Sequence, residues 1–276
     1  MIRFPPRRIL AAVDLTPASA PSWRAATELA ARFDATLDAV YCEPPLGPEV
    51  EAYGAVARLD AVRGALARLR RRLGPGARLH VVRGEPAPVL ARLARERRYD
   101  LLVMGTHRRR GLSRLLAPSV AGAVARDCGC PVLVVPRYRA IRRVLAPVNE
   151  ADYARRGLLA AGLVARAFKA RLSVLTVVTD PVFGASPARL LRERIAELPE
   201  AVRRDARPES KVAREGPVAD ILRSTKGHDL VVLAAHRKSL LGDWVLGTTV
   251  ERVLRHSPVP VLSVPSDARR RSTIII

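Results

Sequence analysis

The stretch Tyr99-Asp100-Leu101-Leu102-Val103-Met104 returns 129 residues later as His228-Asp229-Leu230-Val231-Val232-Leu233. At the same offset, Pro131-Val132-Leu133-Val134-Val135-Pro136 returns as Pro260-Val261-Leu262-Ser263-Val264-Pro265. Similarity at a fixed offset indicates a duplicated structural unit. The 276 residues are enough for two domains that each bury a core of their own. We therefore predict two tandem copies of one domain, over residues 1–138 and 139–276.

Each copy alternates short apolar runs with segments of helical periodicity. The run at residues 9–13 is almost entirely apolar, which is typical of a strand buried on both faces. Alternation of this kind predicts an α/β fold: two Rossmann-like, doubly wound domains, each a mainly five-stranded parallel sheet with helices on both faces. The expected strands of the first copy are 9–13, 35–42, 79–83, 101–104 and 132–135, and its expected helices are 21–33, 50–73, 87–97 and 119–127. The second copy repeats this order from 144–148 to 261–264.

Asp14 and Gly105 directly follow the first and fourth apolar runs of the first copy. Ligands of doubly wound sheets bind beyond the carboxyl ends of the strands, where the strand order reverses. We therefore expect a binding site around these two residues. In the second copy Asn149 and Ala234 stand at the corresponding positions.

The segment from Met104-Gly105-Thr106-His107 to Ser119-Val120 resembles the signature loop of the universal stress protein family, and the resemblance covers the whole chain, twice over. Nucleotide-binding members of that family carry G-x-x-G, nine residues, and then G-[ST] before a helix. Glycine lets the backbone approach phosphate, and the N–H groups at the helix start receive its charge. The resemblance implies a cytoplasmic stress-response regulator that binds ATP, with Mg²⁺ or Mn²⁺, and does not turn it over.

Neither copy has the complete loop. Arg108 and Pro118 replace two glycines of the first copy, and Ala234 and Arg237 replace two in the second. Proline removes a backbone donor, and losing a hydrogen bond to a charged group costs about 1.5–3 kcal/mol, so we expect weak binding. A scaffold protein of the same fold that needs no nucleotide therefore stays open as an alternative. The candidate nucleotide-binding residues are Asp14, Val40, Gly105, His107, Arg108 and Ser119 in the first copy, and Pro147, Asn149, Gly247 and Thr248 in the second.

Composition narrows the remaining classes of function. Lys and Arg outnumber Asp and Glu by 48 to 26, which gives a net charge of +22. The arginines are spread along helical stretches, which indicates solvated helix faces. Nucleic-acid binding, an outside alternative, would require arginines clustered on one face.

Three cysteines make no disulfide framework, the histidines have no metal-ligand spacing, and no apolar run is long enough to span a bilayer. We expect a cytoplasmic protein with no metal and no membrane partner.

The last apolar run of each copy, 132–135 and 261–264, is bracketed by prolines. An apolar strand at a sheet margin has unpaired backbone groups and favours a partner strand. Separate subunits of the resembled family commonly pair through this strand. Fusion raises the effective concentration of one copy for the other, so we expect an antiparallel pairing of these two strands that makes the chain a pseudo-dimer. The oligomeric state beyond the pseudo-dimer is left open.

Overall fold

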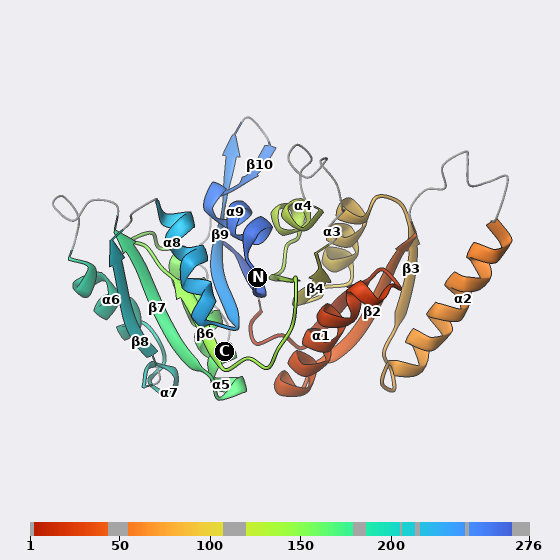
Figure 1. Cartoon of the computed structure of the whole chain (residues 1–276), viewed down its shortest axis with the longest axis horizontal. Coiled ribbons are helices and arrows are strands. Elements are labelled where there is room, and N and C mark those ends of the chain that lie inside the picture. The colour runs from red at the N-terminus through yellow and green to blue at the C-terminus, as the bar shows by residue number, and fades with distance from the viewer. Residues whose placement is uncertain are drawn as a thin grey trace.

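A single continuous sheet runs through the chain and carries helices on both faces (Figure 1). The structure, a computed structural model, describes residues 3–43, 55–106, 120–178, 186–204, 206–212, 216–240 and 243–266. Within these ranges eleven strands belong to the sheet, and ten of them follow the order β3-β2-β1-β4-β5-β11-β9-β6-β7-β8. The α/β, doubly wound architecture predicted from the alternation of apolar runs is confirmed.

The first half of the molecule contains β1 to β5, all parallel, in the order β3-β2-β1-β4-β5. The strand order reverses between β1 and β4, where Ala12 pairs with Met104. The elements are β1 (Arg8–Val13), α1 (Ala20–Phe33), β2 (Thr36–Glu43), α2 (Ala55–Arg72), β3 (Leu79–Arg83), α3 (Pro86–Glu96), β4 (Leu101–Gly105), α4 (Val120–Asp127) and β5 (Val132–Val135).

The second half repeats this arrangement with β6, β7, β8, β9 and β11 in the order β8-β7-β6-β9-β11. Its elements are β6 (Arg143–Pro147), α5 (Ala154–Phe168), β7 (Arg171–Val178), α6 (Pro187–Ala196), α7 (Glu200–Arg203), β8 (Ala206–Val212), α8 (Pro217–Ser224), β9 (Leu230–Leu240), β10 (Asp243–Leu246), α9 (Thr248–His256) and β11 (Val261–Ser266).

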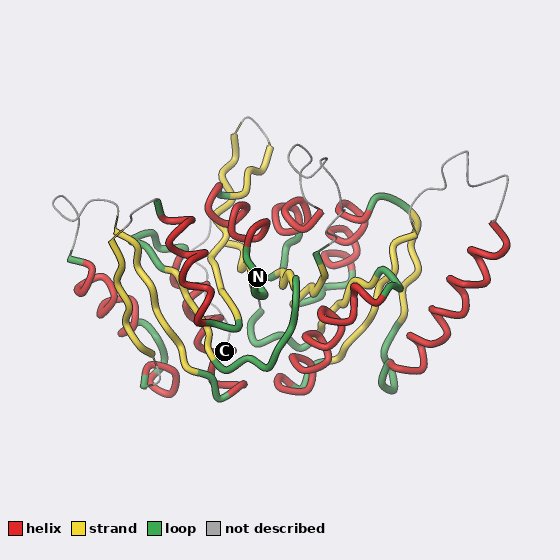
Figure 2. The backbone as a smooth tube through the Cα atoms, in the orientation of Figure 1, coloured by secondary structure: helices red, strands yellow, loops and turns green. Residues whose placement is uncertain are grey.

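One feature of the second half departs from the repeat. β4 ends at Gly105, but β9 continues to Leu240 and pairs antiparallel with β10. The resulting hairpin projects from the top of the molecule in Figure 2. His236, which lies 129 residues after the candidate His107, belongs to the extended strand β9.

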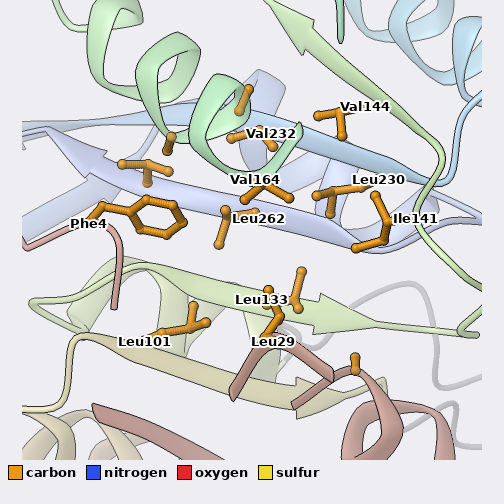
Figure 3. Packing of buried hydrophobic residues seen from close by; sticks show 14 of the residues in the cluster. Phe4, Leu29, Leu101, Leu133, Ile141, Val144, Val164, Leu230, Val232 and Leu262 are labelled. Carbon is orange, nitrogen blue, oxygen red and sulfur yellow. The ribbon is translucent and has the colours of Figure 1, made fainter. Parts of the chain in front are cut away.

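The two halves meet where β5 lies antiparallel to β11, with Leu133 opposite Leu262 and Val134 opposite Val261. All four side chains are buried, and Figure 3 shows Leu133 and Leu262 within one apolar cluster that draws on both halves. Helices cover this junction on both faces, since α4 contacts α9 and α1 contacts α5. The core is therefore continuous across the junction.

The short connection between β5 and β6 is fastened to both halves. The hydroxyl of Tyr138 donates to Glu28 Oε2 over 2.6 Å, and Arg139 forms an ion pair with Asp229 over 2.5 Å. Across the junction, the guanidinium of Arg32 lies 5.4 Å from the ring centroid of Phe168. These contacts hold the second half against the first with few residues between them.

An aspartate fixes the start of the first strand in each half. Asp100 Oδ2 accepts the N–H groups of Arg7 and Arg8 at 2.9 and 3.0 Å. Asp229 Oδ2 accepts those of Arg142 and Arg143, both at 2.9 Å. A charge-assisted pair of hydrogen bonds satisfies backbone donors at the sheet margin, which explains why the aspartate recurs in both copies of the repeated stretch.

Candidate functional site

In the first half Asp14 and Gly105 lie at the same edge of the sheet. Asp14 follows the last residue of β1, and Gly105 ends the neighbouring strand β4. Because the two strands are parallel neighbours at the point of order reversal, their carboxyl ends open the crevice in which ligands of this architecture bind. The topology thus brings together the two residues that the sequence placed there.

The carboxylate of Asp14 organises the turn that follows β1. Its Oδ1 accepts the backbone N–H of Thr16 at 2.9 Å and the Thr16 hydroxyl at 2.8 Å, which forms an Asx-turn. Leu15, between them, has a left-handed φ of 61°. Non-glycine residues held in this region concentrate at functional sites, so the turn is a candidate for ligand contact.

Gly105 lies against the start of α1. A Cβ added there would meet Ser22 Oγ at 3.5 Å and the carbonyl oxygen of Ala18 at 3.9 Å. Val40, another candidate, is fully buried at its pairing with Ala12, so its side chain packs in the core beneath this edge. His107, Arg108 and Ser119 lie outside the described residues.

In the second half Asn149 preserves the turn and lacks the charge. Its Oδ1 accepts the N–H of Ala151 at 3.2 Å, as Asp14 Oδ1 does for Thr16, while its Nδ2 donates to the Tyr153 hydroxyl at 3.1 Å. The buried Arg194 donates from Nε to the Asn149 carbonyl oxygen at 3.2 Å and from Nη2 to that of Glu150. Internal contacts thus hold the turn that follows β6 and Pro147.

An aromatic stack covers the corresponding edge of β9. Tyr153 and His236 lie with ring centroids 4.8 Å apart and an interplanar angle of 14°. The carbonyl oxygen of His236 accepts the Gly247 N–H at 3.3 Å, immediately before Thr248 begins α9. A backbone donor that the resemblance assigns to phosphate is therefore used to close the β9–β10 hairpin.

The helix next to this edge also packs more tightly in the second half. A Cβ on Gly157 of α5 would come within 2.7 Å of the Ala234 backbone nitrogen and 3.1 Å of the Ala234 Cβ. Gly157 and Ala234 occupy the places of Ser22 and Gly105, so the glycine has moved from the strand to the helix. Helix α5 therefore packs more closely against the β9 backbone at Ala234 than α1 packs against the β4 backbone at Gly105.

The cysteines are packing residues. Burial raises the pKa of Cys42 to about 11, so its thiol stays protonated at neutral pH. Cys128 and Cys130 are buried with their sulfur atoms 3.3 Å apart, and the hydrogen bond between the two thiols, together with burial, raises the pKa of Cys130. A protonated thiol is a poor nucleophile. Within the described ranges there is also no cluster of three or more His, Cys, Asp or Glu residues that could hold a metal ion.

Comparison with known proteins identifies the fold and the repeat together. A family model described as "Universal stress protein family" matches residues 5–136 and again residues 140–265. This chain belongs to the universal stress protein family. The two matched ranges correspond to the two halves on either side of the β5–β11 junction.

Individual relatives agree with this assignment. A universal stress protein of Methanocaldococcus jannaschii, MJ0531, is 31% identical over 140 residues, which are 48% of this chain and 82% of the relative. Universal stress protein A homolog 1 of Coxiella burnetii is 33% identical over 141 residues, 47% of this chain and 95% of the relative. Among solved structures, a universal stress protein of Archaeoglobus fulgidus superposes with a TM-score of 0.72 at 17% identity, and the match covers 95% of this chain and 97% of that one. The last comparison shows a fold shared over nearly the whole chain.

Sequence reasoning missed a polar network at the opposite, amino-terminal edge of the first half. The Tyr99 hydroxyl donates to Asp38 Oδ2 over 2.5 Å and lies 2.9 Å from His80 Nε2. Burial, helped by the hydrogen bond to Asp38, raises the pKa of Tyr99, so the phenol keeps its proton and the imidazole donates to it. The three residues come from separate elements, and the recurrence of an aromatic ring before the aspartate, as Tyr99 and His228, was the only signal.

None of the described helices is long and apolar enough to cross a bilayer.

Proposed function

We propose that this universal stress protein is a non-enzymatic, cytoplasmic regulator whose first half binds an adenine nucleotide such as ATP, weakly, while its second half acts as a structural partner. The proposal rests on the contrast between the two carboxyl edges. The first half keeps the Asp14 carboxylate beside Gly105, and an acidic oxygen can accept hydroxyl groups of a ribose. At the same place the second half has an uncharged Asn149, a ring stack and an internally bonded Gly247 N–H.

The role of Asp14 can be separated from its role in the turn. Asp14→Asn removes the charge and keeps an Oδ1 acceptor, as Asn149 does in the second half. Calorimetry with ATP and Mg²⁺ or Mn²⁺ should give one site per chain, with affinity lowered about tenfold or more in Asp14→Asn, which corresponds to the loss of about 1.4 kcal/mol. Asn149→Ala is the matched control and should leave the affinity unchanged.

Two results would refute this. If millimolar ATP gives neither heat nor a rise in melting temperature, no nucleotide is bound by the native state, and the scaffold alternative holds. A stoichiometry of two would mean that the second half also binds nucleotide.

Turnover of ATP should be negligible, far below the usual enzymic range of about 1–10³ per second, because the described part of the site has no residue placed to activate water.

A further inference from the structure

Exposed arginines gather at the amino-terminal edge of the first half, opposite the candidate nucleotide site. Arg7 precedes β1, Arg78 precedes β3, and Arg97 and Arg98 follow α3. All four side chains are exposed. In Figure 1 this edge includes the lower right of the molecule, where α2 ends and β3 begins.

The backbone groups of these arginines form hydrogen bonds that fix the position of each residue. The N–H of Arg7 donates to Asp100, and the N–H of Arg78 donates to Asp38 over 2.7 Å. The Arg97 carbonyl oxygen accepts from Arg8 Nη1 over 2.5 Å. With the Arg98 N–H donating to the Arg95 carbonyl oxygen over 3.2 Å, all four exposed arginines have hydrogen-bonded backbone at this margin of the sheet.

The carboxylates at this edge are already engaged. Asp38, 4% exposed, accepts from Tyr99 and Arg78 and lies 3.8 Å from Arg8 Nη2. Asp100 accepts the two N–H groups of Arg7 and Arg8. No ion pair or hydrogen bond joins the guanidinium of Arg7, Arg78, Arg97 or Arg98 to any group in the described part of the chain. Some arginines on helices elsewhere do have acidic partners, as in Arg63–Asp60, Arg189–Glu193 and Arg204–Glu200.

The resulting positive potential acts on His80. Burial lowers the pKa of this imidazole most, Asp38 opposes the shift, and Arg97, Arg78 and Arg8 each lower it further. Of the four edge arginines, Arg78 and Arg97 are therefore close enough to His80 to lower its pKa.

We propose that this edge binds the phosphate backbone of nucleic acid. A guanidinium presents a planar fork of donors that matches phosphate, and several unpaired forks at one sheet edge suit a polyanion. The net charge of +22 would attract such a partner over long distances. An anionic membrane is less well matched, because Val81 is the only large hydrophobic side chain exposed in the described residues and an interfacial site buries an apolar face.

Binding of a short fluorescein-labelled DNA duplex, followed by anisotropy between about 50 and 200 mM salt, tests the proposal. The edge variant combines Arg7→Gln, Arg78→Gln, Arg97→Gln and Arg98→Gln. It keeps every backbone hydrogen bond described above. The logarithmic dependence of affinity on salt should become shallower by about 0.9 for each guanidinium that contacts phosphate, and so by up to about 3.6.

The control variant also removes four positive charges, but at positions away from this edge. It combines Arg92→Gln, Arg189→Gln, Arg192→Gln and Arg252→Gln, all at exposed positions on helices. Its salt dependence should change by less than about one-third as much as that of the edge variant. The double variant Arg97→Gln/Arg98→Gln should give an intermediate value. Equal losses in the edge and control variants would show that only the total charge matters and would overturn the proposal. So would failure of the native protein to bind the duplex, or binding to phosphatidylglycerol vesicles alone.

Discussion

Ser263 and Ser266 are both buried on β11, but their hydroxyl groups are in different situations. Ser266 Oγ donates to the Ala235 carbonyl oxygen over 3.0 Å. Ser263 Oγ has no hydrogen-bond partner in the described part of the chain and lies at the junction, opposite Val132. A buried polar atom without a partner retains its full desolvation cost.

Ser263→Ala should therefore raise the free energy of unfolding by about 1 kcal/mol, because it removes that cost. Ser266→Ala should lower it by about 1 kcal/mol, because it deletes a satisfied hydrogen bond. Urea unfolding of both variants is the measurement. A shift of the same sign in both would show that hydrogen bonding does not distinguish the two sites.

His80 gives the stability of the first half a pH dependence. Since its pKa is lowered in the folded state, the unfolded chain, with a histidine pKa of about 6.5, takes up the proton more readily. The contribution of His80 to stability is thus complete above pH 6.5 and is lost as the pH falls from there toward the folded pKa.

When the pH falls from 7.5 to 5.0, it passes through the unfolded-state histidine pKa of about 6.5. Over this range the free energy of unfolding should fall more for the native protein than for His80→Gln. The amide of the variant can still donate to Tyr99. His256→Gln, at an exposed position on α9, controls for the loss of an imidazole. Equal pH dependence in the native protein and His80→Gln would contradict the assignment.

At the scale of the elements, the second half has its glycine in the helix, as Gly157 of α5, and an alanine in the strand, as Ala234 of β9. The absence of a side chain on Gly157 lets α5 lie close to β9. Gly157→Ala places a methyl group within 2.7 Å of the Ala234 nitrogen, so either the helix or the strand must move. We expect a loss of about 1–3 kcal/mol in the free energy of unfolding, as for other overpacked sites. Gly105→Ala is the matched control, since its Cβ makes only an ordinary contact with Ser22 and should cost less. Thermal and urea unfolding would compare them, and a larger loss for Gly105→Ala would contradict this account.

Most elements could be predicted because local chemistry decides them. The apolar run before Asp14 became β1, and residues 79–83 and 132–135 became β3 and β5 with the predicted bounds. The hairpin of β9 with β10 could not be predicted from the repeat, because the first copy has Gly105 at the strand end and the second has Ala234 followed by Ala235.

Part of the candidate site could likewise be predicted from the sequence, and part could not. The topology rule alone places Asp14 near Gly105, because both end parallel neighbours at the order reversal. The Tyr153–His236 stack depends on how far β9 extends and on the course of the turn after Asn149. Both are tertiary outcomes, and no local pattern in the sequence encodes them.

For the whole molecule, the junction of β5 with β11 carries the tandem arrangement. Val134→Asp puts a carboxylate at a position that is 1% exposed and paired with Val261. Burying an ionised group without a partner is strongly unfavourable, so we expect separation of the halves, aggregation or a large drop in melting temperature.

Val81→Asp introduces the same side chain on the edge strand β3, where the native residue is 52% exposed, and should change the melting temperature little. Differential scanning calorimetry and size-exclusion chromatography would compare the two variants. If Val134→Asp melts and elutes like the native protein, the junction does not hold the halves together.

The fused junction also changes how the two halves can diverge. When two identical chains pair through a strand, one codon change alters both sides of the contact at once. Here Val134 in one copy corresponds to Ser263 in the other, so each side can change while the other compensates. The same independence lets Asn149 arise without altering Asp14. Duplication within a single gene thus frees selection from the two-fold symmetry of a homodimer, and mutations that would be lost when imposed twice can persist when they occur once.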